Sequence, residues 1–138
     1  MEVNVLKIKT SELVEAIYQL NDNGLFWILF GVIIADFLTG TLKAFVSKDL
    51  DSSAGTLGLI KHICVILIVV SVSLVGYIME NDFIAYTFIT FYLFNYLLSI
   101  IENLHVIGVP FPDFIEDNLR RLKETQGKEY NEKKKGGF

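Results

Sequence analysis

Residues 25–46 read LFWILFGVIIADFLTGTLKAFV, an apolar run long enough to cross a lipid bilayer as one helix. Asp36 lies near the centre of this run, and Lys43 follows about two helical turns later. A carboxyl group at mid-membrane costs about 3 kcal/mol on insertion-based scales. Charges kept at such a cost usually serve an ion path, a proton relay or a polar contact between helices. Asp36 is therefore the first candidate functional residue.

Two further apolar runs follow, and with their flanks they give predicted spans at about 61–79 and 83–101. Of the 138 residues, 52% are apolar, and they are gathered in these blocks instead of being dispersed. They surround each predicted helix and do not form the single stripe of a soluble amphipathic helix. The sequence therefore predicts an all-α membrane protein, with three transmembrane helices in a domain that covers residues 25–105.

Residues 1–24 form a predicted amphipathic N-terminal segment, with a short extended lead followed by a helix. Thr10 and Ser11 are the candidate caps, because a hydroxyl oxygen can accept from the backbone N–H groups of the first turn. Apolar residues repeat along this helix at helical spacing. They are Leu13, Val14, Ile17 and Leu20. Such a helix either lies in the membrane interface or packs on its own bundle, and both interpretations remain open.

Polar and turn-forming segments separate the predicted helices. Ser47–Leu59 is rich in Ser and Gly and is expected to be a loop. The link at 80–82 is so short that it predicts an antiparallel helical hairpin. The stretch GVPFP at 108–112 interrupts helical structure, and Pro112 suits the first position of a new amphipathic helix. Residues 106–138 are thus expected to form a cytoplasmic helix and a disordered charged tail.

The distribution of Lys and Arg predicts the orientation in the membrane. With three spans, Lys7 and Lys9 lie on one side, and the other ten of the twelve basic residues lie on the opposite side. Because basic residues favour the cytoplasmic side, we expect the C-terminus inside the cell and the N-terminus outside. If the first apolar run were interfacial or re-entrant, the chain would have two spans and both ends inside.

Polar and small residues recur on particular helix faces within the spans. The predicted assembly or pore face of the first span comprises Asp36, Thr39, Gly40, Lys43, Gly31 and Ala35. The second polar ridge, on the third span, comprises Asn95, Ser99 and Glu102. Small residues four apart let helix backbones approach closely. Three helices cannot enclose a useful aqueous path, so these ridges predict a homo-oligomer. A fixed polar seam inside a static bundle is the alternative for both sets.

Several classes of function find no support in the residues. The net charge of −4 gives no nucleic-acid signature, and the single Cys64 cannot form an internal disulfide. The sequence has no set of residues typical of a catalytic triad, no Gly-rich phosphate loop and no His or Cys cluster with metal-ligand spacing. We therefore predict neither enzymatic activity nor a cofactor or metal. A proton relay between Asp36 and His62 is a weaker alternative.

Five stretches carry a resemblance to a known family. They are DFLTG at 36–40, KAF at 43–45, the segment from Ser52-Ser53 and Gly55 to Lys61, SIIEN at 99–103, and GVPFP at 108–112. In order and spacing, residues 25–125 resemble the phage lysis holins. The similarity is strongest to the branch shared with toxin-secretion holins of Gram-positive bacteria and their phages.

The resemblance implies a small protein that accumulates in the bacterial cytoplasmic membrane, oligomerises there and opens lesions. In the family these lesions release an endolysin, which degrades the cell wall and lyses the host. Some relatives instead export a large protein toxin. The implied partners are thus other copies of the chain, membrane lipids, and an endolysin or toxin as cargo. A non-lytic membrane scaffold or accessory subunit, binding a partner through the helix at 112–124, is the rival interpretation.

Overall fold

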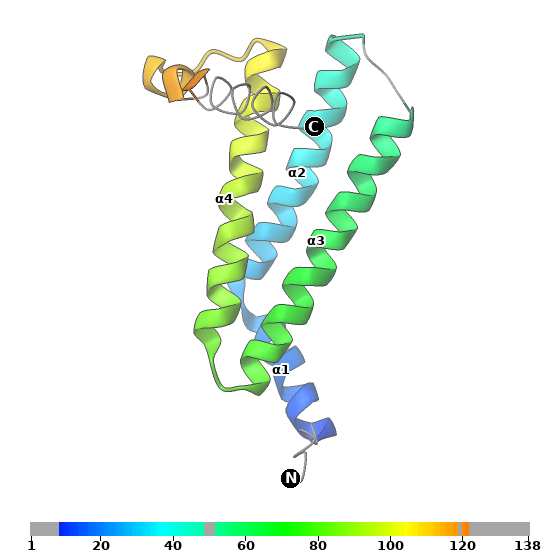
Figure 1. Ribbon diagram of the computed structural model, residues 1–138, viewed down its shortest axis with the longest axis vertical. Coiled ribbons are helices and arrows are strands. Elements are labelled where there is room, and N and C mark those ends of the chain that lie inside the picture. Colours follow the sequence, from blue (N-terminus) through cyan, green and yellow to red (C-terminus); the bar gives the residue numbers. More distant parts are fainter. Residues whose placement is uncertain (1–8, 49–51, 119, 122–138) are drawn as a thin grey trace, which may run out of the picture.

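The computed structural model describes residues 9–48, 52–118, 120 and 121, and these form an all-α structure. Its helices are α1 (Thr10–Asp22), α2 (Gly24–Val46), α3 (Ser52–Ile78) and α4 (Asp82–Ile107). The helices α2, α3 and α4 run up, down and up to form a bundle, and α1 extends from its lower end (Figure 1). The prediction of an all-α protein with three long apolar helices is confirmed.

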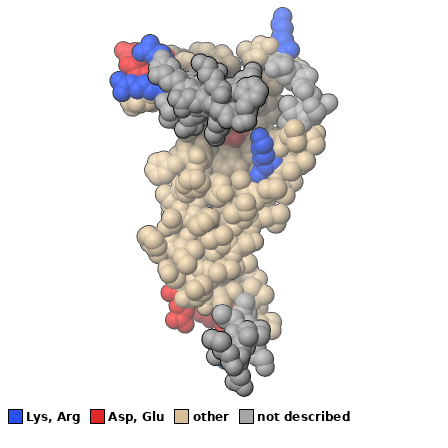
Figure 2. Space-filling model, viewed as in Figure 1, with Lys and Arg blue, Asp and Glu red and all other residues tan. Residues whose placement is uncertain are grey.

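Three helices are long and apolar enough to cross a membrane, over Gly24–Val46, Gly55–Ile78 and Asp82–Ile107. At 1.5 Å per residue, α2 is about 35 Å long, enough for a hydrocarbon core of about 30 Å. The first apolar run is therefore one continuous helix. Charged side chains gather toward the two ends of the visible face, and a broad, mostly uncharged band lies between them (Figure 2). This surface suits a membrane-embedded protein.

Helix α4 organises the bundle, because it packs against both α2 and α3, whereas α2 and α3 touch each other less. The main core cluster comprises Leu29, Ile33, Val69, Ile89 and Tyr96. Most other large apolar side chains point outward, and Phe83 and Phe94 are 77% and 69% exposed. In a bilayer such faces contact lipid or another protein rather than water, so a small core is sufficient to hold the bundle together.

Helix α1 packs on the end of α3 through a narrower face than the sequence predicts. Ala16 and Leu20 are buried against Tyr77, but the other stripe residues are exposed. These are Leu13, Val14 and Ile17. The expected capping by Thr10 or Ser11 is wrong: Lys9 precedes the helix, and its backbone N–H donates to the Glu12 carboxylate at 3.0 Å. The longer glutamate side chain reaches back over the first turn and satisfies that donor.

Asn23 joins α1, α2 and α3 at one buried point. Its Oδ1 accepts from the backbone N–H groups of Leu25 and Phe26, at 3.0 and 3.3 Å, and so caps α2. Its Nδ2 donates to the Tyr77 hydroxyl at 2.8 Å. The amide therefore satisfies two free N–H groups of the helix start and fixes that start to α3.

An Asn23→Ala variant should lose about 1–2 kcal/mol of stability, because it removes the cap of α2 and the partner of the Tyr77 hydroxyl. Thermal unfolding of the purified protein in detergent micelles, followed by circular dichroism, measures this loss. Tyr77→Phe is the matched control and should lose less, because it leaves the cap intact. Equal melting temperatures of Asn23→Ala and wild type would contradict the role of Asn23 in capping α2 and fixing it to α3.

Two helices extend beyond their predicted limits. The expectation of a loop over Ser47–Leu59 is wrong from Ser52 onward, because α3 already begins there. Helix α4 likewise continues past 101 to Ile107. Extending an existing helix adds one hydrogen bond for each residue fixed, so polar residues and isolated glycines are often included at its ends. The hydrophobic length of a span thus underestimates its helical length.

The turn predicted after α4 is present. Gly108 adopts φ 98°, and the Val109 N–H donates to the Leu104 carbonyl at 3.0 Å, which ends the helix with a left-handed cap. Residues 113–118 are helical again. The Pro112 carbonyl accepts from the N–H of Ile115 at 2.8 Å, so Pro112 precedes this helix instead of opening it. The predicted charged tail lies outside the described residues.

The α3–α4 hairpin requires a glycine at position 76. A Cβ atom there would lie 3.1 Å from the Asn81 carbonyl oxygen, 3.2 Å from Ile84 Cβ and 3.4 Å from the Ala85 nitrogen. The Asn81 N–H donates to the Gly76 carbonyl at 2.9 Å across the turn, and Glu80 adopts φ 54°. The short link predicted at 80–82 therefore closes an antiparallel hairpin whose backbones approach closely at Gly76.

Candidate functional site

A cluster of five polar side chains lies inside the bundle, and all three spanning helices contribute to it. Its members, called the polar cluster below, are Asp36, Thr39, His62, Tyr96 and Asn103. Asp36 is only 8% exposed, and its Oδ1 accepts from Asn103 Nδ2 at 3.2 Å. The same Nδ2 lies 3.4 Å from Thr39 Oγ1. The Asp36 carboxyl group, which would be costly to expose to lipid, is therefore enclosed by protein.

His62 is the residue through which α3 contributes to the polar cluster. Its Nε2 lies 3.9 Å from Asp36 Oδ2, and its Nδ1 lies 3.0 Å from the Tyr96 hydroxyl. The imidazole is thus held between a carboxyl group from α2 and a phenol from α4. Interactions of this kind are strengthened by the low dielectric of the interior, and each one lowers the cost of the other buried polar groups.

Helical periodicity explains how the cluster forms. Asp36 and Thr39 lie one turn apart on α2, and the Thr39 hydroxyl also donates to the Asp36 carbonyl at 3.1 Å. Tyr96 and Asn103 are both buried and lie seven residues apart, so they share the inner face of α4. This face meets α2 at Asp36 and α3 at His62.

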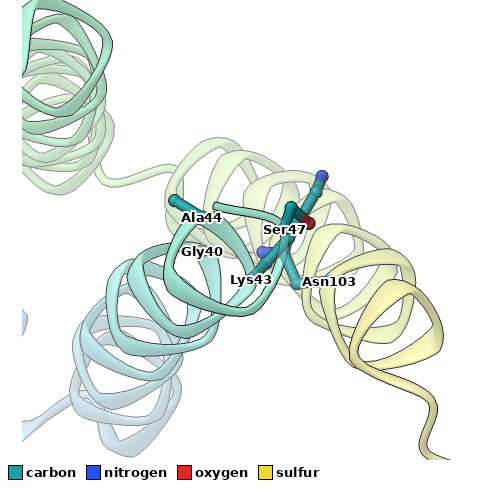
Figure 3. A pocket seen from close by; sticks show the side chains of 5 residues that line it. All are labelled: Gly40, Lys43, Ala44, Ser47 and Asn103. Atoms are coloured by element: carbon teal, nitrogen blue, oxygen red, sulfur yellow. The ribbon is translucent and has the colours of Figure 1, made fainter. Parts of the chain in front are cut away.

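A hollow of about 220 Å³ lies beside the cluster, between the ends of α2 and α4. It is lined by Gly40, Lys43, Ala44, Ser47 and Asn103 (Figure 3). A Cβ atom on Gly40 would lie 3.6 Å from Asn103 Nδ2, an ordinary van der Waals contact, so this position of α2 lies directly beside the Asn103 amide. The hollow is partly polar and large enough for water, and it borders the side chain that binds Asp36.

The structure brings together only part of the predicted assembly face. Asp36 and Thr39 belong to the polar cluster, and Gly40 and Lys43 line the hollow beside it. Gly31 is exposed, and a Cβ atom there would meet nothing within 4 Å. Ala35 is half-buried and also lies outside the cluster. Gly31 therefore does not mediate close helix packing within one chain.

The predicted second ridge does not face the cluster. Asn95 is exposed, and Ser99 and Glu102 are half-buried. The inner face of α4 instead carries Tyr96 and Asn103, each one residue further along. A shift of one residue rotates a position by about 100° around the helix, which moves the ridge away from α2.

The sequence pattern does not predict two members of the cluster, Asn103 and Tyr96. It indicates His62 only through the weaker alternative of a proton relay with Asp36. Their spacing does place them together: Tyr96 and Asn103 are seven residues apart, so both lie on the same side of a helix. Hydropathy alone could not decide whether that side or the neighbouring ridge faces inward.

The cluster can hold protons and hydrogen bonds, but it does not have the composition of a metal centre. Among the described residues, no group of three or more His, Cys, Asp or Glu side chains could hold a metal ion. The carboxyl, imidazole, phenol and amide groups of the cluster instead form polar contacts that join the three helices. The fold and the cluster together define a small integral membrane protein with three spanning helices joined by a buried polar contact.

The chain belongs to the Bacteriophage holin family, whose sequence pattern matches residues 16–124. It is 34% identical over 91 residues to a probable holin of Bacillus phage phi105, covering 65% of this chain and 67% of that protein. An uncharacterized protein of Clostridium perfringens strain 13 is 33% identical over 94 residues, covering 65% and 68%.

A second Clostridium perfringens relative, an uncharacterized 14.9 kDa protein in the nagH 3′ region, is 31% identical over 100 residues. This match covers 68% of the present chain and 73% of the relative. No solved structure matches the chain. The resemblance to phage holins drawn from the sequence motifs is therefore confirmed by the family pattern and by the similarity to the probable phage holin.

Proposed function

We propose that this protein acts as a holin: it accumulates in the bacterial cytoplasmic membrane, assembles with its own copies and opens lesions. An endolysin then reaches the cell wall through these lesions, and the host cell lyses. Membership of the holin family and the similarity to a probable phage holin support this proposal. The three apolar helices supply the membrane anchorage that it requires.

The observation that carries the proposal is the enclosure of Asp36. In a single chain its carboxyl group is bound by Asn103 and bordered by His62, so this charge is shielded from lipid. A water-filled lesion needs polar side chains on its wall, and three helices enclose no such path. Separation of α2 from α4 would expose Asp36, Thr39 and Lys43 on one side of α2, where several copies could line a lumen together.

The proposed orientation places the C-terminus in the cytoplasm. Lys43 lies in the last turn of α2, Lys48 follows that helix, and Lys61 lies in the first half of α3. The end of α2, the start of α3 and the end of α4 lie at the same end of the bundle (Figure 1). Basic residues are retained on the cytoplasmic side, so this end is assigned to that side. The end that carries α1 then faces the outside of the membrane.

The cargo of the lesion is proposed to be an endolysin, because the named phage relative is a probable holin. Export of a large toxin would use the same membrane device. A non-lytic scaffold differs physically, since it leaves the membrane intact. Induced production of the full chain with a potential-sensitive dye separates a lesion-forming protein from a scaffold: a holin of either kind collapses the membrane potential, whereas a scaffold leaves it unchanged.

An energy poison, added before the scheduled time, should cause premature lysis in cells that make this protein together with an endolysin. Moving one charge across the membrane potential changes the free energy by about 2.3 kcal/mol per 100 mV. Asp36 and Lys43 lie at different depths, about 10 Å apart along α2, so the potential can bias a closed arrangement. Culture turbidity measures the response.

The control is a culture that makes the endolysin alone and receives the same poison. It should remain turbid, because the enzyme stays inside the cell. If the cells with both proteins also remain turbid while the full chain is present in the membrane fraction, control by the membrane potential is wrong.

A further inference from the structure

Asn95 is an exposed amide at the midpoint of a membrane-spanning helix. Helix α4 runs from Asp82 to Ile107, so Asn95 lies about 20 Å from either end. At that depth a bilayer offers no water. Exposed apolar side chains surround the amide on the same side of α4. They are Phe88, Phe91 and Leu98.

The Asn95 amide is only partly satisfied by its own helix. Its Nδ2 donates to the Phe91 carbonyl at 2.7 Å, and no other described residue forms a hydrogen bond with the side chain. An amide has a second N–H donor and a carbonyl oxygen with two lone pairs. Both would face lipid in a single chain, and unpaired polar groups are strongly disfavoured there.

Two threonine side chains on outer helix faces differ from Asn95 in this respect. The hydroxyls of Thr41 and Thr87 donate their single proton to the carbonyls of Phe37 and Phe83, at 2.8 and 2.7 Å. A hydroxyl satisfied in this way leaves no donor toward lipid. An asparagine amide cannot fill all of its hydrogen-bonding positions within one helix, so we expect Asn95 to bind a partner outside the chain.

We propose that the outer face of α4 around Asn95 is the contact surface for a second copy of this chain, with the two Asn95 amides hydrogen-bonded to each other. Copies inserted in one orientation hold Asn95 at the same depth and their α4 helices parallel. A two-fold axis along the membrane normal, passing beside this face of α4, then brings Asn95 against its own counterpart. An amide is both donor and acceptor, so it is self-complementary in such a contact.

The inward location of the polar cluster supports this choice of surface. Asp36 and Asn103 bind each other within one chain, so they offer no hydrogen bond to a neighbour in that arrangement. Asn95 remains as the exposed polar side chain at mid-membrane depth on α4. The inference deepens the proposed function by naming the surface through which closed copies first associate, before α2 and α4 separate.

Cysteine crosslinking of the full chain in liposomes of phosphatidylethanolamine and phosphatidylglycerol tests the contact. Cys64 is exposed and is first replaced in a Cys64→Ser background. Phe88→Cys should then form disulfide-linked dimers on mild oxidation, because Phe88 lies two helical turns before Asn95 on the same side of α4 and its replacement leaves the Asn95 amide in place. Thr87→Cys is the matched control, because Thr87 is exposed at nearly the same depth as Phe88 but points about 100° away. Equal or stronger crosslinking at position 87 would overturn the proposed surface.

A second measurement uses energy transfer between labelled full-length copies in the same liposomes. Asn95→Leu should weaken dimer formation about 3- to 20-fold, the range expected for one interhelical polar contact. Asn95→Gln should restore part of it. Ser71→Leu, an exposed change on α3, should have little effect. Unchanged dimer formation by Asn95→Leu would refute the role of the amide.

Neither measurement depends on lysis, so the two proposals can fail separately. Dimers through Asn95 in a protein that leaves the membrane potential intact would uphold the contact and refute the holin function. Potential collapse by a protein whose Asn95→Leu variant still dimerises fully would uphold the function and refute the contact.

Discussion

Cells that produce an Asn103→Leu variant with an endolysin should lyse earlier than cells that produce the wild-type chain. Leucine cannot donate the 3.2 Å hydrogen bond to Asp36, so the carboxyl group loses this donor inside the bundle. Leaving a buried polar group unpaired costs about 1–3 kcal/mol, and more for a charged one. That cost falls on the closed arrangement and shifts the equilibrium toward opening by about 5- to 150-fold.

The time of lysis and the loss of membrane potential are the measurements, with the amount of protein in the membrane determined in parallel. Asn118→Leu is the matched control. Asn118 is exposed after the α4 turn and bonds the Phe114 carbonyl of its own helical segment, so its replacement should leave the timing unchanged. Later lysis by Asn103→Leu, with a normal amount of the protein in the membrane, would contradict the prediction that Asn103 stabilises the closed state.

Asp36→Leu should act in the opposite direction and delay or abolish lysis. Removing the carboxyl group relieves the closed bundle of its most costly buried group, since apolar replacement of a buried charge is often neutral or stabilising. It also removes a charge from the proposed lumen wall. The double variant Asp36→Leu/Asn103→Leu should resemble Asp36→Leu. If Asp36→Leu lyses cells on the wild-type schedule and oligomerises normally, Asp36 has no role in assembly or opening.

A Gly76→Leu variant should fail to accumulate as a folded protein. Even a Cβ atom at position 76 would lie 3.1 Å from the Asn81 carbonyl oxygen, and backbone atoms of a tight hairpin cannot move aside easily. Inserting extra methylene groups into a packed core costs about 1–3 kcal/mol of stability, and a leucine side chain inserts several carbon atoms at once. Thermal unfolding in detergent micelles and the amount of protein in the membrane measure the effect.

Gly31→Leu is the matched control for this prediction, because a side chain there meets open space within the chain. The folded monomer should keep its melting temperature in this variant. Any defect of Gly31→Leu in cells would then report contacts between copies, as the small-residue series of α2 suggests. Equal melting of Gly76→Leu and wild type would show that the hairpin tolerates a wider separation of α3 and α4.

The sequence by itself determined the number and type of the main elements. Long apolar runs leave few choices in a bilayer, because each backbone polar group must be paired and a helix achieves this within one segment. The run around Asp36 therefore predicted a spanning helix, and the short link at 80–82 predicted a hairpin. Gly108 marked the end of α4 because it adopts the positive φ angle of a helix cap. Helix ends were less certain, as the early start of α3 at Ser52 shows.

Only the tertiary structure decided which side of each helix faces inward. In water an apolar stripe must face the core, but in a bilayer lipid and neighbouring helices are equally apolar, so hydropathy does not fix the rotation of a helix. The sequence therefore could not choose between the ridge at Asn95 and the face at Asn103, which differ by about 80° around α4. The packing of α4 between α2 and α3 settled the choice, bringing Asn103 and His62 to Asp36 and leaving Asn95 outside.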